Sequence, residues 1–238
     1  KIQSAIIRTG HGIISIGTDT DATLAQDCFS IPHLYPIQRY AIANILDSIH
    51  QIVVLPTGSG KSLCFHLPSL LLPGITLIIL PLLSLMKDQL RRLSEVNINC
   101  CCIKGGQDKN ERRRYLEDMT SGKIKVVFTT PESLEAAGSP ESAGLDYFFK
   151  QVDISHLVID EAHCVTEWGD TFRPAYLKIG GFIEKWKPGV ISAFTATASP
   201  PVVAKIKKSL FGSLPVSSLI ENPDRQNIHY SVIPVLSK

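Results

Sequence analysis

The stretch Leu55-Pro56-Thr57-Gly58-Ser59-Gly60-Lys61-Ser62 decides the fold of this chain. It follows an apolar run and precedes a helix-compatible segment, which is the context of a phosphate-binding loop. Glycines permit a backbone in which successive N–H groups point at phosphate oxygens, and the following helix presents its positive end to the same anion. Lys61 can reach the terminal phosphates, and the Ser62 hydroxyl can ligate magnesium. We therefore predict that the nucleotide-binding residues here are Thr57, Gly58, Ser59, Gly60, Lys61 and Ser62.

Two positions in or next to this loop restrict the kind of nucleotide-binding protein to which it can belong. Leu55 stands where the usual pattern has its first glycine, and the Gly-Lys-Ser order that follows is intact. Leu63 stands where a dinucleotide-binding fingerprint has its third glycine, which argues against a dehydrogenase. A glycine-rich turn with a solvated lysine is the alternative interpretation. The Gly-Lys-Ser order at a strand-to-helix junction disfavours it.

Short apolar runs recur along the chain and are separated by helix-like segments. They do not alternate in polarity, which is typical of strands covered on both faces, and they span 53–55, 76–80, 99–103, 126–128, 157–159 and 190–194. Ile37, Ala41, Ile45 and Ile49 recur at every fourth residue and predict one apolar helix face, and 111–119 is a second, more charged helix. The alternation predicts an α/β fold: a doubly wound, mostly parallel sheet with helices on both faces.

Two carboxylates end the run Leu157–Ile159. Ligands of a doubly wound sheet lie at the carboxyl ends of its strands, so Asp160 is a candidate magnesium ligand opposite Ser62. Glu161 is a candidate base for the water that attacks the γ-phosphate. A helix cap is the alternative for the pair, and the loop upstream disfavours it. His163 is a candidate link to a second site, although a lone histidine is most often structural.

Composition sets further bounds on the 238 residues. The formal net charge of +2 indicates that any nucleic-acid contact must come from a local patch. The six cysteines form no Cys-x-x-Cys pair, so we expect no zinc site, no disulfide and a reducing compartment. No apolar run approaches the ~20 residues of a membrane span, so we expect no membrane partner. Because the chain begins at Lys1, we expect it to be part of a longer protein.

Several motifs of this chain resemble those of one family, the RecQ-type DNA helicases of superfamily two. Asp160-Glu-Ala-His163 followed by Cys164 resembles the second helicase motif of that branch. In the right order, the other similar segments are 80–89, 130–132, 168–174, 194–198 and 225–228. The resemblance covers roughly residues 29–232 and implies the first of two RecA-like motor domains.

The resemblance also implies roles for individual residues. ATP and Mg²⁺ are the expected cofactors, with Glu161, Asp160 and Lys61 as catalytic residues and Gln38 as the residue that hydrogen-bonds adenine. Single-stranded or partly duplex DNA is the expected partner, inside the cell. A second motor domain, following in cis, is expected to supply an arginine finger.

Residues expected to contact DNA, or to couple it to hydrolysis, are Trp168, Phe172, Arg173, His163, Ser84 and Lys87. Aromatic side chains stack on bases without sequence preference, which suits a translocating motor. Core packing is the alternative for Trp168 and Phe172, and a solvated helix face is the alternative for Lys87. Arg112-Arg113-Arg114, the one basic run, is interpreted first as an exposed helix face.

The chain departs from the family pattern at two places. Leu34 and Tyr35 replace the Phe-Arg pair before the adenine-contacting glutamine, and Asp170-Thr171 replaces His-Asp in the aromatic loop. We expect a lead-in over 1–27, a RecA-like ATP-binding domain over 28–220 and the start of a linker over 221–238. Two alternatives stay open: an RNA helicase or other P-loop ATPase, and a degenerate ATP-gated DNA-binding module.

Overall fold

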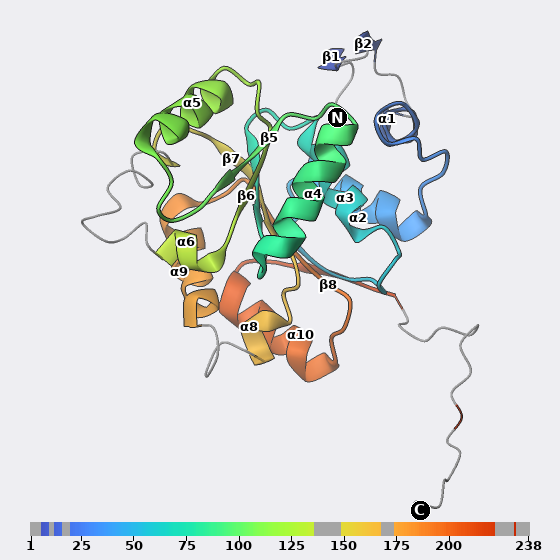
Figure 1. Cartoon of the computed structure of the whole chain (residues 1–238). Coiled ribbons are helices and arrows are strands. Elements are labelled where there is room, and N and C mark those ends of the chain that lie inside the picture. The colour runs from blue at the N-terminus through green and yellow to red at the C-terminus, as the bar shows by residue number, and fades with distance from the viewer. Residues whose placement is uncertain are drawn as a thin grey trace, which may run out of the picture.

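The computed structural model describes residues 6–9, 12–15, 20–135, 149–167, 174–221 and 231. Its centre is a seven-stranded sheet in the order β5-β6-β4-β7-β8-β3-β9 (Figure 1). The strands are β3 Gln51–Val54, β4 Ile75–Ile79, β5 Cys100–Ile103, β6 Val126–Thr129, β7 Ile154–Ile159, β8 Val190–Thr195 and β9 Ser217–Ile220. Each neighbouring pair is parallel, which confirms the predicted doubly wound sheet.

Helices cover the sheet on both sides. The α-helices are α1 Thr20–Phe29, α2 Pro36–Leu46, α3 Lys61–Ser69, α4 Leu83–Glu95, α5 Lys109–Thr120, α6 Pro131–Glu135, α8 Cys164–Glu167, α9 Ile179–Trp186 and α10 Pro200–Ile206. A 3₁₀ segment, η3 Pro174–Lys178, precedes α9, and a π-helical segment, η4 Lys207–Phe211, follows α10. In Figure 1, α4 crosses in front of the strands.

The two faces of the sheet bury different side chains because successive residues of a strand point to opposite sides. On β3, Ile52 and Val54 join the apolar cluster that includes side chains of α5, α8 and α9. Val53 belongs to the cluster on the other face, with side chains of α2, α3 and α4. Burial on both faces explains the continuous apolar runs of the sequence.

One predicted helix position is wrong. Ile37, Ala41 and Ile45 lie in α2, but the helix ends at Leu46, and Ile49 lies beyond it with 42% of its surface exposed. The backbone turns at Ser48, whose φ is 59°, so the four-residue spacing no longer places Ile49 on the buried face.

The N-terminal part contains regular structure that the sequence did not predict. β1 Ile6–Thr9 and β2 Gly12–Ser15 pair as an antiparallel hairpin. Helix α1 runs across the predicted boundary at residue 27 and buries Leu24, Ala25 and Cys28 against α2 and α3. The short edge strand β9, with its Ser-Ser-Leu-Ile sequence, was also not predicted.

All six cysteines are free. Within the described ranges, no helix combines the length and apolar composition that a bilayer crossing requires. The same residues contain no group of three or more His, Cys, Asp or Glu side chains that could hold a metal ion.

Candidate nucleotide-binding site

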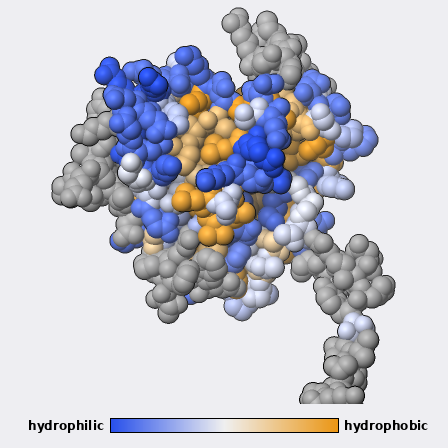
Figure 2. All heavy atoms as spheres, in the orientation of Figure 1, coloured by the Kyte–Doolittle hydropathy of each residue, from blue (hydrophilic) through white to orange (hydrophobic). Residues whose placement is uncertain are grey.

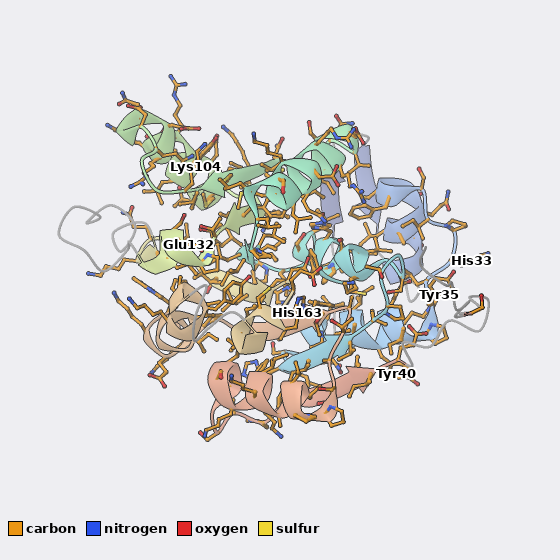
Figure 3. All side chains as sticks on the ribbon, turned by 60° about the horizontal axis from the view of Figure 1, so that its bottom comes forward. His33, Tyr35, Tyr40, Lys104, Glu132 and His163 are labelled. Carbon is orange, nitrogen blue, oxygen red and sulfur yellow. The ribbon has the colours of Figure 1, made fainter. Side chains whose placement is uncertain are left out.

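Three segments meet at the carboxyl edge of the sheet because β8 lies between β3 and β7. The N–H of Leu55, after β3, donates to Thr195 O at 3.0 Å, and the N–H of Ala162, after β7, donates to Phe194 O at 2.8 Å. The glycine-rich loop and the acidic strand end are thus tied to the same strand. Figure 3 shows His163 centrally in this region, with Tyr35 and Tyr40 toward one side and Glu132 and Lys104 toward the other.

The glycine-rich loop has the backbone that the sequence predicts. Gly58 and Gly60 have φ of 83° and 75°, values that residues other than glycine rarely adopt. Lys61 begins α3 directly after the loop, so the helix presents its unpaired N–H groups toward it. The Lys61 ammonium lies 3.4 Å from Leu55 O, folded back over the loop.

Gln38 lies buried against this loop. Its Nε2 donates to Ser59 O at 2.8 Å, and its Oε1 accepts from the Tyr35 N–H at 2.9 Å. A Cβ on Gly60 would come within 2.6 Å of Gln38 Nε2, so a side chain there would displace the Gln38 amide from the loop. The amide keeps one N–H and one oxygen lone pair for further partners. The contact joins α2 to the loop.

The carboxylates after β7 differ in environment. Asp160 is 8% exposed, and its Oδ1 accepts from the Glu161 N–H at 2.9 Å, whereas the Glu161 side chain is half-buried and its φ is 50°. The pKa of the Asp160 carboxyl is raised to about 6, first by burial and then by the Glu161 charge. The hydrogen bond from the Glu161 N–H and the positive charge of Lys61 oppose this shift in the pKa.

His163 connects the acidic segment to β8. Its Nδ1 lies 3.0 Å from Thr195 Oγ1 and 3.4 Å from Glu161 Oε2. Thr195 Oγ1 donates to Thr197 O at 3.0 Å, so it accepts from the histidine, whose proton is on Nδ1. Sequence reasoning placed His163 near the site but did not find Thr195 as its partner. The Thr-Ala-Thr segment resembling a coupling motif was the available signal.

Ser84 and Lys87 lie exposed in the first half of α4. Exposed apolar side chains accompany them: Leu82, Leu83 and Leu85 are each at least 40% exposed. Figure 2 shows hydrophobic side chains gathered on the face of the molecule that carries α4.

Arg113 and Arg114 lie exposed on α5, as the first interpretation expected, whereas Arg112 is half-buried. Arg113 forms an exposed ion pair with Glu117 at 3.1 Å, and Arg112 Nη2 donates to Lys104 O. The aromatic-loop residues Trp168, Phe172 and Arg173 lie outside the described residues, as does the segment 225–228.

The chain is similar to known helicases over this region. A family model described as DEAD/DEAH box helicase matches residues 35–206. RecQ-like DNA helicase blm-1 of Caenorhabditis elegans is 36% identical over 204 residues, 83% of this chain and 20% of that protein. ATP-dependent DNA helicase RecQ of Synechocystis sp. is 34% identical over 208 residues, 84% of this chain and 42% of that protein. The chain therefore spans less than half the length of these curated relatives.

Solved structures support the fold. The helicase MrfA bound to DNA and AMPPNP matches with a TM-score of 0.66 and 21% identity, covering 92% of this chain and 31% of that one. Helicase Lhr of Mycobacterium smegmatis, bound to ssDNA and AMP-PNP, matches with a TM-score of 0.62 and 22% identity, covering 84% of this chain and 27% of that one.

Proposed function

This chain belongs to the DEAD/DEAH box helicase family, and we propose that it is the first motor domain of a RecQ-type DNA helicase, which binds and hydrolyses ATP to move along single-stranded DNA. The attachment of the glycine-rich loop and the acidic segment to the same strand, by the bonds of Leu55 N–H to Thr195 O and of Ala162 N–H to Phe194 O, is the observation that carries the proposal. It brings a phosphate-binding lysine and a buried carboxylate together, which phosphoryl transfer requires.

In this proposal the loop residues Thr57 to Ser62 hold the phosphates of ATP. The loop N–H groups and the start of α3 face the anion, and the Lys61 ammonium leaves Leu55 O to reach the terminal phosphates. Gln38 uses its remaining N–H and lone pair on adenine, and exposed Tyr35, which follows the Leu34 that replaces the family's phenylalanine, is available to stack on the base.

The residues that would hold Mg²⁺ are Ser62 and Asp160. The donor set fits, because a hydroxyl and a carboxylate are hard oxygen ligands, and a divalent cation would offset the unfavourable burial of Asp160 beside Glu161. When bound, Mg²⁺ supplies positive charge that neutralises the phosphate oxygens. Glu161 accepts the proton of the attacking water, and His163 Nδ1 lies beside both the Glu161 carboxylate and the Thr195 hydroxyl.

DNA contact is assigned to Ser84 and Lys87 on α4 and to the aromatic segment with Trp168, Phe172 and Arg173. A second motor domain in cis would supply an arginine finger, worth about 10³–10⁵ in rate. Residues 28–220 form the ATP-binding domain in this assignment, followed by a linker, and the packing of α1 joins residues 20–27 to it. No zinc is assigned to this part of the protein. The protein acts on DNA inside the cell, in the nucleus or nucleoid.

ATP turnover tests the proposal. We expect this chain to hydrolyse MgATP slowly by itself, and a chain extended through the second domain to be stimulated by single-stranded DNA. Lys61→Ala should abolish turnover in both. Lys123→Ala is the matched control, because Lys123 is an exposed lysine paired with Asp118 far along the chain from the loop. Turnover that survives Lys61→Ala would refute the ATPase, and turnover of the extended chain that ignores DNA would refute the DNA-dependent motor.

A further inference from the structure

A chain of side-chain hydrogen bonds links α4 to α3 behind the phosphate-binding loop. Gln89, on α4, donates from Nε2 to Ser62 Oγ at 3.1 Å. Its Oε1 lies 3.0 Å from His66 Nε2. Ser62 and His66 are four residues apart on α3 and therefore lie on the same helix face. The side-chain amide of Gln89 on α4 therefore contacts both Ser62 and His66.

The direction of these bonds is fixed by chemistry. Because the amide nitrogen of Gln89 donates to Ser62, its oxygen accepts, and His66 must carry a proton on Nε2. The ring is neutral, since burial lowers the pKa of His66 to about 4. His66 Nδ1 is buried without a hydrogen-bond partner. Reversing the amide would move the proton to Nδ1, so that a buried N–H rather than a buried lone pair would lack a partner.

His66 itself is held in place by packing. Its ring lies edge-on to Phe65 at 4.7 Å and to Phe128 at 6.2 Å between ring centroids. It is 5% exposed, whereas Gln89 is half-buried at the boundary of the site. A rigid histidine therefore sets the orientation of Gln89, and Gln89 in turn sets that of Ser62.

The consequence falls on the Ser62 hydroxyl. A hydroxyl oxygen has two lone pairs and one proton. Gln89 occupies one lone pair, which fixes the side-chain rotamer and leaves the other lone pair and the proton for a ligand. We propose that Gln89 is a positioning residue that holds Ser62 ready for the magnesium ion of MgATP. This inference rests on the proposed function of the site.

Nucleotide binding with and without magnesium tests the inference separately from activity. The probe is a fluorescent, non-hydrolysable ATP analogue, titrated in excess Mg²⁺ and again in EDTA. We expect Gln89→Leu to weaken binding about tenfold in Mg²⁺, the usual effect of removing the hydrogen-bond partner of a metal ligand, and to leave binding in EDTA unchanged. Gln107→Leu is the matched control, because Gln107 also bridges two groups, Cys102 O and the Lys104 N–H, away from the loop. It should bind like the wild type in both conditions.

Because Gln89→Leu leaves the His66 N–H unpaired, the pair His66→Phe with Gln89→Leu provides a second variant with an apolar core. It should show the same loss confined to Mg²⁺, at a thermal midpoint close to that of the wild type. Equal weakening in Mg²⁺ and EDTA would reduce Gln89 to a structural link between helices and overturn the inference.

Ser62→Ala distinguishes a failure of the positioning role of Gln89 from a failure of the proposed magnesium site. If Ser62→Ala removes the effect of Mg²⁺ while Gln89→Leu keeps it, the positioning role is wrong and the proposed site stands. If Ser62→Ala keeps the full effect of Mg²⁺, the magnesium assignment of the proposed function is itself wrong, and the role of Gln89 falls with it.

Discussion

His163 Nδ1 lies 3.0 Å from Thr195 Oγ1, although 32 residues separate them in the chain. The bond joins the acidic segment after β7 to the end of β8, and the same nitrogen lies 3.4 Å from Glu161 Oε2. The side chain that would activate water is thereby connected to a neighbouring strand. A change at the end of β8 can therefore reach the Glu161 carboxylate through one imidazole.

Replacing Thr195 with valine should uncouple this connection without enlarging the core. We expect Thr195→Val to lower kcat by about tenfold, equivalent to about 1.4 kcal/mol, while the affinity for the ATP analogue changes less than twofold. Steady-state turnover and analogue titration measure the two quantities. Thr129→Val is the control, because Thr129 is equally buried at the end of β6, where its Oγ1 donates to Ile103 O. A comparable loss of kcat in Thr129→Val would show that the effect is not specific to His163.

Gly60 and Gly106 have the same backbone conformation, so a comparison of their alanine variants distinguishes backbone strain from steric crowding of the new Cβ. Gly60 has φ of 75° and lacks room for a Cβ beside Gln38, whereas Gly106 has φ of 72° and nothing within 4 Å of a Cβ. We expect both alanine variants to lose about 1 kcal/mol of unfolding free energy to backbone strain. Only Gly60→Ala should lose nucleotide binding as well. Urea unfolding and analogue titration test this, and intact binding by Gly60→Ala would contradict the close packing of the loop on Gln38.

Asp160 should destabilise the nucleotide-free protein above pH 6. Its pKa is raised to about 6 in the folded state from an ordinary value of 3.8, so the contribution of this group to stability is greatest below pH 4 and is lost as the pH rises through 6. We expect Asp160→Asn to unfold with the same free energy as the wild type near pH 4. Above pH 6 the variant should be more stable by roughly 2–3 kcal/mol.

Urea unfolding in EDTA, at intervals from pH 4 to pH 8, gives this comparison. The variant should nevertheless fail to hydrolyse ATP. Equal unfolding free energies of the two proteins across the whole pH range would show that ionisation of Asp160 does not destabilise the folded protein.

His156 should make the fold sensitive to acid. Its ring is fully buried, with Nε2 2.9 Å from Ser192 Oγ, and burial lowers the pKa of the imidazole to about 3 from 6.5. Below pH 6.5 the unfolded chain gains a proton that the folded chain does not, so this part of the stability is present above pH 6.5 and lost as the pH falls toward 3. We expect His156→Leu to flatten the fall of unfolding free energy between pH 6.5 and pH 4 by up to about 1.4 kcal/mol per pH unit. Identical slopes in the two proteins would contradict the buried neutral histidine.

The sequence alone determined the sheet and the kind of site. Each continuous apolar run became a parallel strand because burial on both faces excludes polar residues, and this physical requirement is local. The glycine-rich loop was readable because Gly58 and Gly60 supply left-handed conformations directly before a helix. The end of α2 and the secondary structure before residue 28 were harder to predict from the sequence. Ile49 kept the helical spacing after the backbone had turned, and glycines at positions 10, 12 and 17 interrupt the apolar stretches of the first residues.

Tertiary structure alone decided which side chains complete the site. The strand order places β8 between β3 and β7, and a parallel sheet gives no sequence signal for which strands become neighbours. The bonds of Thr195 to His163 and of Gln89 to Ser62 therefore join residues 32 and 27 positions apart. The raised pKa of Asp160 arises in the same way, because its largest cause is burial, which only the folded chain provides.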